Sequence, residues 1–142
     1  NVGLYLRGDS NLDHDYRIDI NGNNTFDIAK EWLDTSSGQA IAKTTMLVAP
    51  QYTGLLHSPG QLNTLSVTMI GPTIVVSLNN LVAAMVSDSA YTNGQIALFA
   101  HNVGGVDGVT VSFTRIEIDR LAQPWQTPVP TPTLIPTATS AG

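Results

Sequence analysis

Four oxygen-bearing side chains alternate along a short stretch near the start of the chain. Asp9, Asn11, Asp13 and Asp15 occupy every second position between two strand-like segments. Carboxylate and amide oxygens are the ligands that Ca²⁺ prefers, and this spacing lets a loop wrap several of them around one ion. Ca²⁺ is therefore the candidate cofactor. We prefer the alternative of an Asx-rich turn, because the central glycine and terminal glutamate of an EF-hand are missing.

Aromatic side chains in loops or at strand ends provide a second candidate site. Sugar binding requires an exposed aromatic platform with polar groups around it. The alternative for Trp32 is a core position, and the alternative for Trp125 is a contact that fastens the C-terminal tail. The predicted carbohydrate-binding residues are Trp32, Tyr52, Tyr91 and Trp125.

The sequence contains no recognisable catalytic constellation. We interpret Asp27 and Glu31 as wrongly spaced for one strand face. Glu117 and Asp119 share a face of the expected last strand, but flanking arginines indicate surface salt bridges. The three histidines lie in separate loops without metal-ligand spacing. We therefore expect no enzymatic activity, and glycoside hydrolysis is the least favoured interpretation.

Composition excludes several classes of protein. A chain of 142 residues is the length of one domain. Its charged fraction of 12% is about half the usual share, and its formal net charge is −5. Six scattered Lys and Arg residues argue against binding to nucleic acid or to an anionic membrane surface. The absence of cysteine excludes disulfides, and no apolar run reaches the ~18 residues of a membrane span.

The stretch 62–88 predicts three consecutive strands. Apolar residues alternate with polar ones over 65–69, Gly71-Pro72 breaks the run, and Ile74, Val76 and Leu78 resume the period of two. Asn79-Asn80 predicts a two-residue type I′ turn. The returning strand, 81–86, is apolar on both faces, and residues 44–87 contain no charged side chain. We therefore expect a sheet that is covered on both sides, by a second sheet plus loops or by a partner chain.

Further strands are predicted on both sides of this stretch. The last one requires a β-bulge at Thr114-Arg115, because its apolar phase slips by one residue. Together the strands predict an all-β, antiparallel, jelly-roll-like sandwich over residues 1–121. Their ranges are 2–7, 16–20, 25–32, 40–49, 95–100 and 109–114.

Residues 122–142 differ abruptly in composition. Proline and threonine alternate without any charge, which favours an extended linker or tail. Its threonines are candidate O-glycosylation sites, and Asn23 begins an N-glycosylation sequon in a turn. We expect an extracellular or cell-surface protein, of bacterial type. The candidate modified residues are Asn23, Thr131, Thr133 and Thr137.

The order of strands and turns resembles the concanavalin A-like lectin/glucanase superfamily, which includes laminin-G-like modules. The resemblance covers most of residues 2–119 and implies the fold rather than an activity. It also implies Ca²⁺ near a sugar site, as in laminin-G and legume-type relatives. An asparagine, Asn80, stands where the family usually has glycine. The matching segments are 3–7, 16–18, 63–67, 76–83, 94–100 and 111–116.

The resemblance also implies strands before the one that matches 2–7. We therefore expect a sandwich that is incomplete at its N-terminus, with an open edge or an uncovered face. Leu134 and Ile135, the apolar spot in the tail, are candidate donors of a completing strand to a neighbouring subunit. The predicted function is a non-catalytic module for carbohydrate binding or adhesion. The alternative is a subunit of an extracellular filament that self-associates through the open edge.

Overall fold

A computed structural model describes residues 1–102 and 110–120. The chain divides into two units, Asn1–Val111 and Ser112–Gly142, and each is described by itself. The described residues form eight strands, all in the first unit, and no helix. None of their segments is a helix long and apolar enough to cross a membrane. The predicted all-β fold is confirmed, while residues 121–142 of the tail lie outside the described part.

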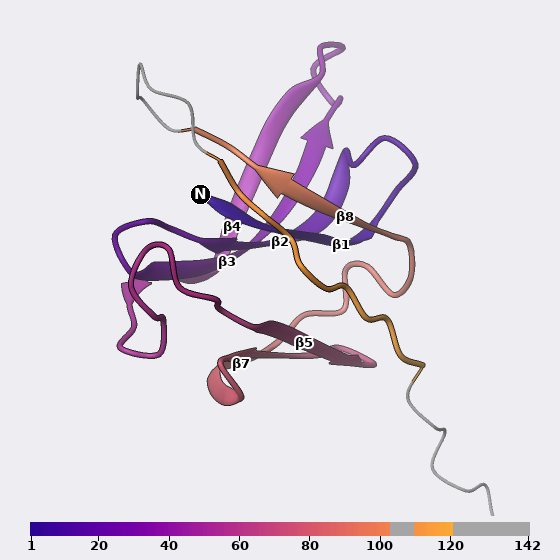
Figure 1. Cartoon of the computed structure of the whole chain (residues 1–142). Coiled ribbons are helices and arrows are strands. Elements are labelled where there is room, and N and C mark those ends of the chain that lie inside the picture. The colour runs from indigo at the N-terminus through magenta and orange to yellow at the C-terminus, as the bar shows by residue number, and fades with distance from the viewer. Residues whose placement is uncertain (103–109, 121–142) are drawn as a thin grey trace, which may run out of the picture. The chain divides into compact units, whose positions relative to one another are not determined.

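Five strands form an antiparallel sheet in the order β4-β3-β2-β1-β8 (Figure 1). Strand β1 pairs with β2 on one side and with β8 on the other. The N-terminal strand is thus interior to this sheet, and β4 and β8 are its edges. The strands are β1 (Val2–Gly8), β2 (His14–Ile20), β3 (Thr25–Asp34), β4 (Ile41–Tyr52) and β8 (Gln95–Ala100).

The other sheet contains three antiparallel strands, β5 (Leu65–Ile70), β6 (Thr73–Leu78) and β7 (Leu81–Ser87). Asn79 and Asn80 join β6 to β7 with φ angles of 49° and 68°. Positive φ at both central residues is what a type I′ turn requires, so the predicted turn is confirmed.

The core lies between one face of each sheet. Strands β1 to β3 contribute large side chains such as Tyr16 and Phe26, and β6 contributes Ile74, Val76 and Leu78. All of these are at most 2% exposed. The packing of two sheets face to face is the architecture of a β-sandwich, and the two layers are visible in Figure 1.

The opposite face of the three-stranded sheet is not covered by described residues. Ile70, Val82 and Met85 are each more than 60% exposed. Within the described residues a second sheet covers one face only, and cover of the other face by a partner chain stays a prediction. The apolar character of β7 on both faces has a local cause, because a bulge opposite Val76 and Ser77 shifts the alternation by one residue.

Residues 110–120 contain no strand. The predicted strand over 109–114 and its bulge at Thr114-Arg115 are wrong within this described stretch. A strand exists only with a hydrogen-bonded neighbour, which alternation in the sequence does not supply. Phe113, Ile116 and Ile118 remain 44% to 70% exposed.

Candidate functional site

Charged side chains line the outer face of the five-stranded sheet, the face turned away from the core. Tyr16 and Ile18 of β2 point into the core, so the alternate residues Asp15, Arg17 and Asp19 point outward. The register places Asp15 opposite Glu31 and Asp19 opposite Asp27. We call these four carboxylates and the arginine between them the Arg17 cluster.

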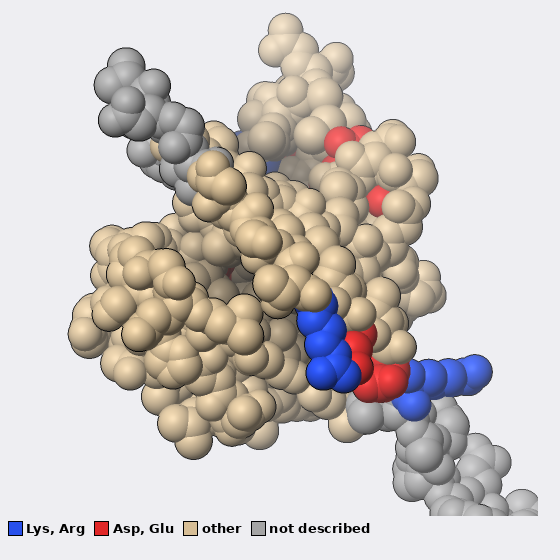
Figure 2. All heavy atoms as spheres, viewed as in Figure 1, with Lys and Arg blue, Asp and Glu red and all other residues tan. Residues whose placement is uncertain are grey.

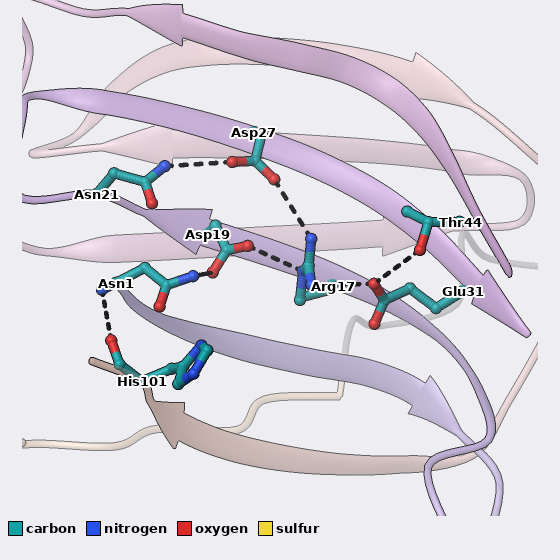
Figure 3. Close-up of polar contacts among 8 residues, drawn as sticks. All are labelled: Asn1, Arg17, Asp19, Asn21, Asp27, Glu31, Thr44 and His101. Carbon is teal, nitrogen blue, oxygen red and sulfur yellow. Dashed lines mark hydrogen bonds and ion pairs between the residues drawn. The ribbon is translucent and has the colours of Figure 1, made fainter. Parts of the chain in front are cut away.

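Arg17 compensates three of the four carboxylates. Its Nε is 2.8 Å from Asp19 Oδ2, its Nη1 is 3.0 Å from Glu31 Oε1, and its Nη2 is 4.0 Å from Asp27 Oδ1. Figure 3 shows the guanidinium between these side chains. Like charges directly opposite on neighbouring strands destabilise a sheet. Arg17 is therefore the group that makes two carboxylate pairs compatible with this face.

Amide side chains extend the cluster at one end of the sheet. Asn1 Nδ2 donates to Asp19 Oδ1 at 2.8 Å, and Asn21 Nδ2 donates to Asp27 Oδ2 at 3.2 Å (Figure 3). Beside them is an open cleft of about 620 Å³. Its lining includes Asn1, Arg17, Asp19, Asn21, Asn23 and Asp27. The cleft thus presents mainly amide and carboxylate groups, the groups that hydrogen-bond sugar hydroxyls.

Two aromatic rings lie on the same face. Phe99 of β8, Gly3 of β1, Asp19 and Asp27 form one cross-strand row. A Cβ atom at Gly3 would lie 1.8 Å from the Ile18 carbonyl oxygen and 3.0 Å from Phe99 Cζ, so a side chain at this position would clash with the backbone of β2. Tyr5, next on β1, packs against Phe99 with ring centroids 4.8 Å apart. Both rings are half-buried. Phe99 belongs to the row that carries Asp19 and Asp27, and Tyr5 lies beside that row.

Asp15 is the carboxyl of the cluster that Arg17 does not reach. It is fully buried, and neither of its oxygens has a hydrogen-bond partner among the described residues. Burial and, to a smaller extent, the charge of Glu31 raise its pKa to about 7, against the opposing effect of Arg17. Burial also raises the pKa of Asp19 to about 6, with Arg17 again opposing.

The structure corrects the interpretation of Asp27 and Glu31. Both lie on the outer face of β3, and both are ion-paired with Arg17. Residues four apart on a strand share a face, because side chains alternate with period two. The spacing was therefore suitable for a shared site. Their partner Arg17 could have been found from the turn over 21–24, which fixes the β2–β3 register.

No ring contact joins Trp32, Tyr52 and Tyr91 to one another in the described part of the chain. Tyr91 is half-buried and structural, since its hydroxyl donates to the Glu31 carbonyl oxygen at 2.8 Å and its ring packs against Tyr16. Trp32 is half-buried near one end of the β3–β4 hairpin, opposite Lys43. Tyr52 is 73% exposed at the other end of that hairpin. Trp125 lies outside the described residues.

The loop of the predicted Ca²⁺ site is held by hydrogen bonds of its own side chains. Asp9 Oδ1 accepts from the Asp13 amide at 2.8 Å, and Asp9 Oδ2 lies 2.9 Å from His14 Nδ1. Asp15 belongs to β2 and is buried, while Asn11 is exposed. In the described ranges no three acidic, histidine or cysteine side chains are arranged to hold a metal ion. The hydrogen bonds of this loop are those of an Asx-type turn.

The remaining predicted residues concern modification and assembly. Asn23 is exposed in the β2–β3 turn, where its Oδ1 accepts from the Thr25 hydroxyl at 2.7 Å. Residues Thr131, Thr133, Leu134, Ile135 and Thr137 lie outside the described part of the chain.

Comparisons with family models, curated proteins and solved structures returned no significant match to this chain. The resemblance to lectin-like sandwiches therefore depends on the sequence pattern alone, and function must be argued from the site.

Replacement of Asp15 by asparagine should stabilise the protein above neutral pH. The folded-state pKa of about 7 exceeds the ordinary value of 3.8, so the folded chain holds more protons than the unfolded chain between these values. The contribution of Asp15 to stability therefore falls as the pH rises from about 4 to about 7. Asp15→Asn removes this loss and should raise the free energy of unfolding at pH 8 by roughly 1 to 3 kcal/mol.

Urea denaturation at pH 5 and pH 8 measures this difference, with Asp119→Asn as a control at an exposed position. The control should change stability by less than about 0.5 kcal/mol at either pH. An Asp15→Asn variant that is less stable than the parent at pH 8 would show that the carboxyl is ionised and compensated.

Proposed function

We propose that the protein is a non-catalytic carbohydrate-binding or adhesion module whose ligand occupies the cleft beside the Arg17 cluster. The observation that carries the proposal is the composition of this cleft, in which amide and carboxylate groups surround Arg17 on a rigid sheet. An extracellular or cell-surface location fits such a role and is part of the proposal.

The chemistry of the cleft suits a hydroxyl-rich ligand. Sugar hydroxyls donate to carboxylate and amide oxygens and accept from amide and guanidinium N–H groups, and the lining supplies both kinds. The rings of Tyr5 and Phe99 lie on the same sheet face outside the cleft lining and add apolar surface for a longer ligand. Hydrogen bonds to Asp19 and Asp27 hold the Asn1 and Asn21 amides in place before binding, which reduces the entropy lost when a ligand binds.

Binding to a panel of neutral and charged oligosaccharides tests this proposal. Asn21→Ala should weaken binding of the best ligand about five- to tenfold, because one hydrogen-bonding group in the cleft contributes about 1 kcal/mol. Gln39→Ala, at an exposed position in the β3–β4 turn, should leave the affinity unchanged. Isothermal titration calorimetry measures both. If no glycan binds, or if both variants bind like the parent, the cleft is not a sugar site.

A second candidate function, self-association as a structural subunit, is supported by a different surface. The outer face of β5, β6 and β7 is free of charge and exposes Ile70, Val82 and Met85. Figure 2 shows that uncharged side chains cover most of the face drawn there. Exposed apolar patches of this kind mark protein interaction sites.

Light scattering after size exclusion tests this second candidate. Self-association through the sheet face predicts a molecular mass that grows with protein concentration. Met85→Lys should restore the monomer, because association would bury the charged lysine side chain in the contact. Leu62→Lys is the matched control, since Leu62 is also 67% exposed but lies in a loop. A monomeric mass at every concentration would eliminate this candidate.

A further inference from the structure

An exposed aromatic ring lies beside the polar cleft. Tyr52 is 73% exposed and is the last residue of β4. The register pairs it with Thr25, and directly opposed residues of an antiparallel pair point to the same face of the sheet. Thr25 shares the outer face with Asp27, two positions further along β3, and both line the cleft. The ring of Tyr52 therefore projects from the face of the sheet that carries the cleft.

The backbone on either side of Tyr52 fixes its position. Pro50, two residues earlier in β4, also lines the cleft. On the other side, the Thr53 amide donates to the Asn24 carbonyl oxygen at 2.9 Å, and Thr53 is buried. Tyr52 is thus held between the β3–β4 pairing and the β2–β3 turn, while its ring stays accessible to a ligand.

The cross-strand row that contains Tyr52 continues into amide side chains. Asn21 follows Thr25 in this row, since its backbone amide donates to the Thr25 carbonyl oxygen at 2.9 Å. The β1–β2 register continues the row to Asn1, and both asparagines line the cleft. Neighbouring strands are about 4.8 Å apart, so the backbones of Tyr52 and Asn21 are separated by about 10 Å. Two linked sugar rings can bridge this distance.

The side chain of Asn21 is oriented by the cleft itself. Its Nδ2 donates to Asp27 Oδ2 at 3.2 Å, and its oxygen is turned away from Asp27 (Figure 3). That oxygen can accept a hydrogen bond from a ligand hydroxyl. The row thus offers an apolar ring surface at one end and a fixed polar group next to it, the combination that small-molecule sites use to bind and orient a ligand.

We propose that Tyr52 is the stacking platform of the sugar site and that the ligand is a neutral oligosaccharide of pyranose rings. The inference rests on the proposed carbohydrate function and specifies its ligand. A pyranose chair with equatorial hydroxyls presents C–H groups on its faces, which pack on an aromatic ring, and hydroxyls around its rim, which bond to amide and carboxylate groups. A furanose ring lacks such a broad apolar face. An acidic sugar would bring a like charge toward Asp19 and Asp27.

Calorimetry with three oligosaccharides of equal length tests the class of ligand. The oligomers consist of β-1,4-linked glucose, of fructofuranose and of galacturonic acid. The glucose oligomer should bind at least about tenfold more tightly than either of the others, because it alone combines an apolar ring face with the absence of charge.

Variants of Tyr52 test the stacking contact. Tyr52→Ala should weaken binding of the glucose oligomer at least about tenfold, whereas Tyr52→Phe keeps the ring and should stay within about threefold of the parent. Leu62→Ala is the control, since Leu62 is also 67% exposed but lies outside the cleft lining, and it should leave the affinity unchanged. Thermal melting confirms that each variant is folded.

Proton NMR of the glucose oligomer supplies a readout that a purely structural role of Tyr52 would not change. A sugar ring stacked on an aromatic side chain has its C–H resonances shifted upfield by the ring current. The upfield shift should appear with the parent and with Tyr52→Phe, and it should disappear with Tyr52→Ala.

The outcomes separate the inference from the function on which it rests. If Asn21→Ala weakens binding but Tyr52→Ala does not, the cleft binds sugar without the platform and the inference is overturned. Equal losses in Tyr52→Phe and Tyr52→Ala would assign the contact to the hydroxyl and also overturn it, as would equal affinity for the furanose or the acidic oligomer. Absence of binding by all three oligomers overturns the inference together with the function.

Discussion

The outer face of the five-stranded sheet depends on one electrostatic constraint, the compensation of opposed carboxylates by Arg17. Two acidic pairs face each other across β2 and β3, with Arg17 between them. Without a cation at that position, neighbouring strands would carry up to four like charges on one face of the sheet. The arginine side chain is 26% exposed and its partners Asp19 and Asp27 are at most 6% exposed, so solvent screens these contacts only in part.

This arrangement also leaves some carboxylate oxygens without a partner. One guanidinium cannot satisfy eight carboxylate oxygens, and the shortfall falls on Asp15 and Asp27. Asp15 lies away from the cleft lining and responds through its raised pKa. Asp27 lines the cleft and keeps only the Asn21 amide and the more distant Arg17 Nη2 as partners. The same scarcity of cations thus leaves a buried acid with a raised pKa in one row and a weakly compensated carboxylate in the other.

Most of the fold could be predicted because its signals are local. Alternating residues in β1, β2, β5 and β6 and the pair Asn79-Asn80 identify strands and a turn without knowledge of their neighbours. The partner with which a strand pairs can lie far away in the sequence, so alternation over 110–114 did not reveal that this segment has no partner strand. For the same reason the sequence did not show which element lies over each face of the β5 to β7 sheet. The surface of Ile70, Val82 and Met85 is exposed because no described element lies over it.

The residues of the candidate site were harder to predict from the sequence than the strands, although the sequence indicates some of them. Arg17 and Asp19 were expected on the polar face of their strand, and the turn over 21–24 implies a register in which paired residue numbers sum to 46. That register sets Asp19 against Asp27 and Asp15 against Glu31. The contribution of Phe99 could not be inferred in this way, because β8 joins β1 across more than 85 intervening residues.

A double-mutant cycle on Arg17 and Asp19 tests the central role of Arg17 most directly. The measured quantity is the free energy of unfolding in urea at neutral pH. Arg17→Gln should cost about 2 to 4 kcal/mol, because it leaves buried carboxylates uncompensated. The single variant Asp19→Asn completes the cycle, and the double variant Arg17→Gln/Asp19→Asn should be at least about 1 kcal/mol more stable than the sum of the two single effects, because one carboxylate then no longer needs a cation. An Arg17→Gln variant within about 0.5 kcal/mol of the parent, or two single effects that simply add, would contradict this account.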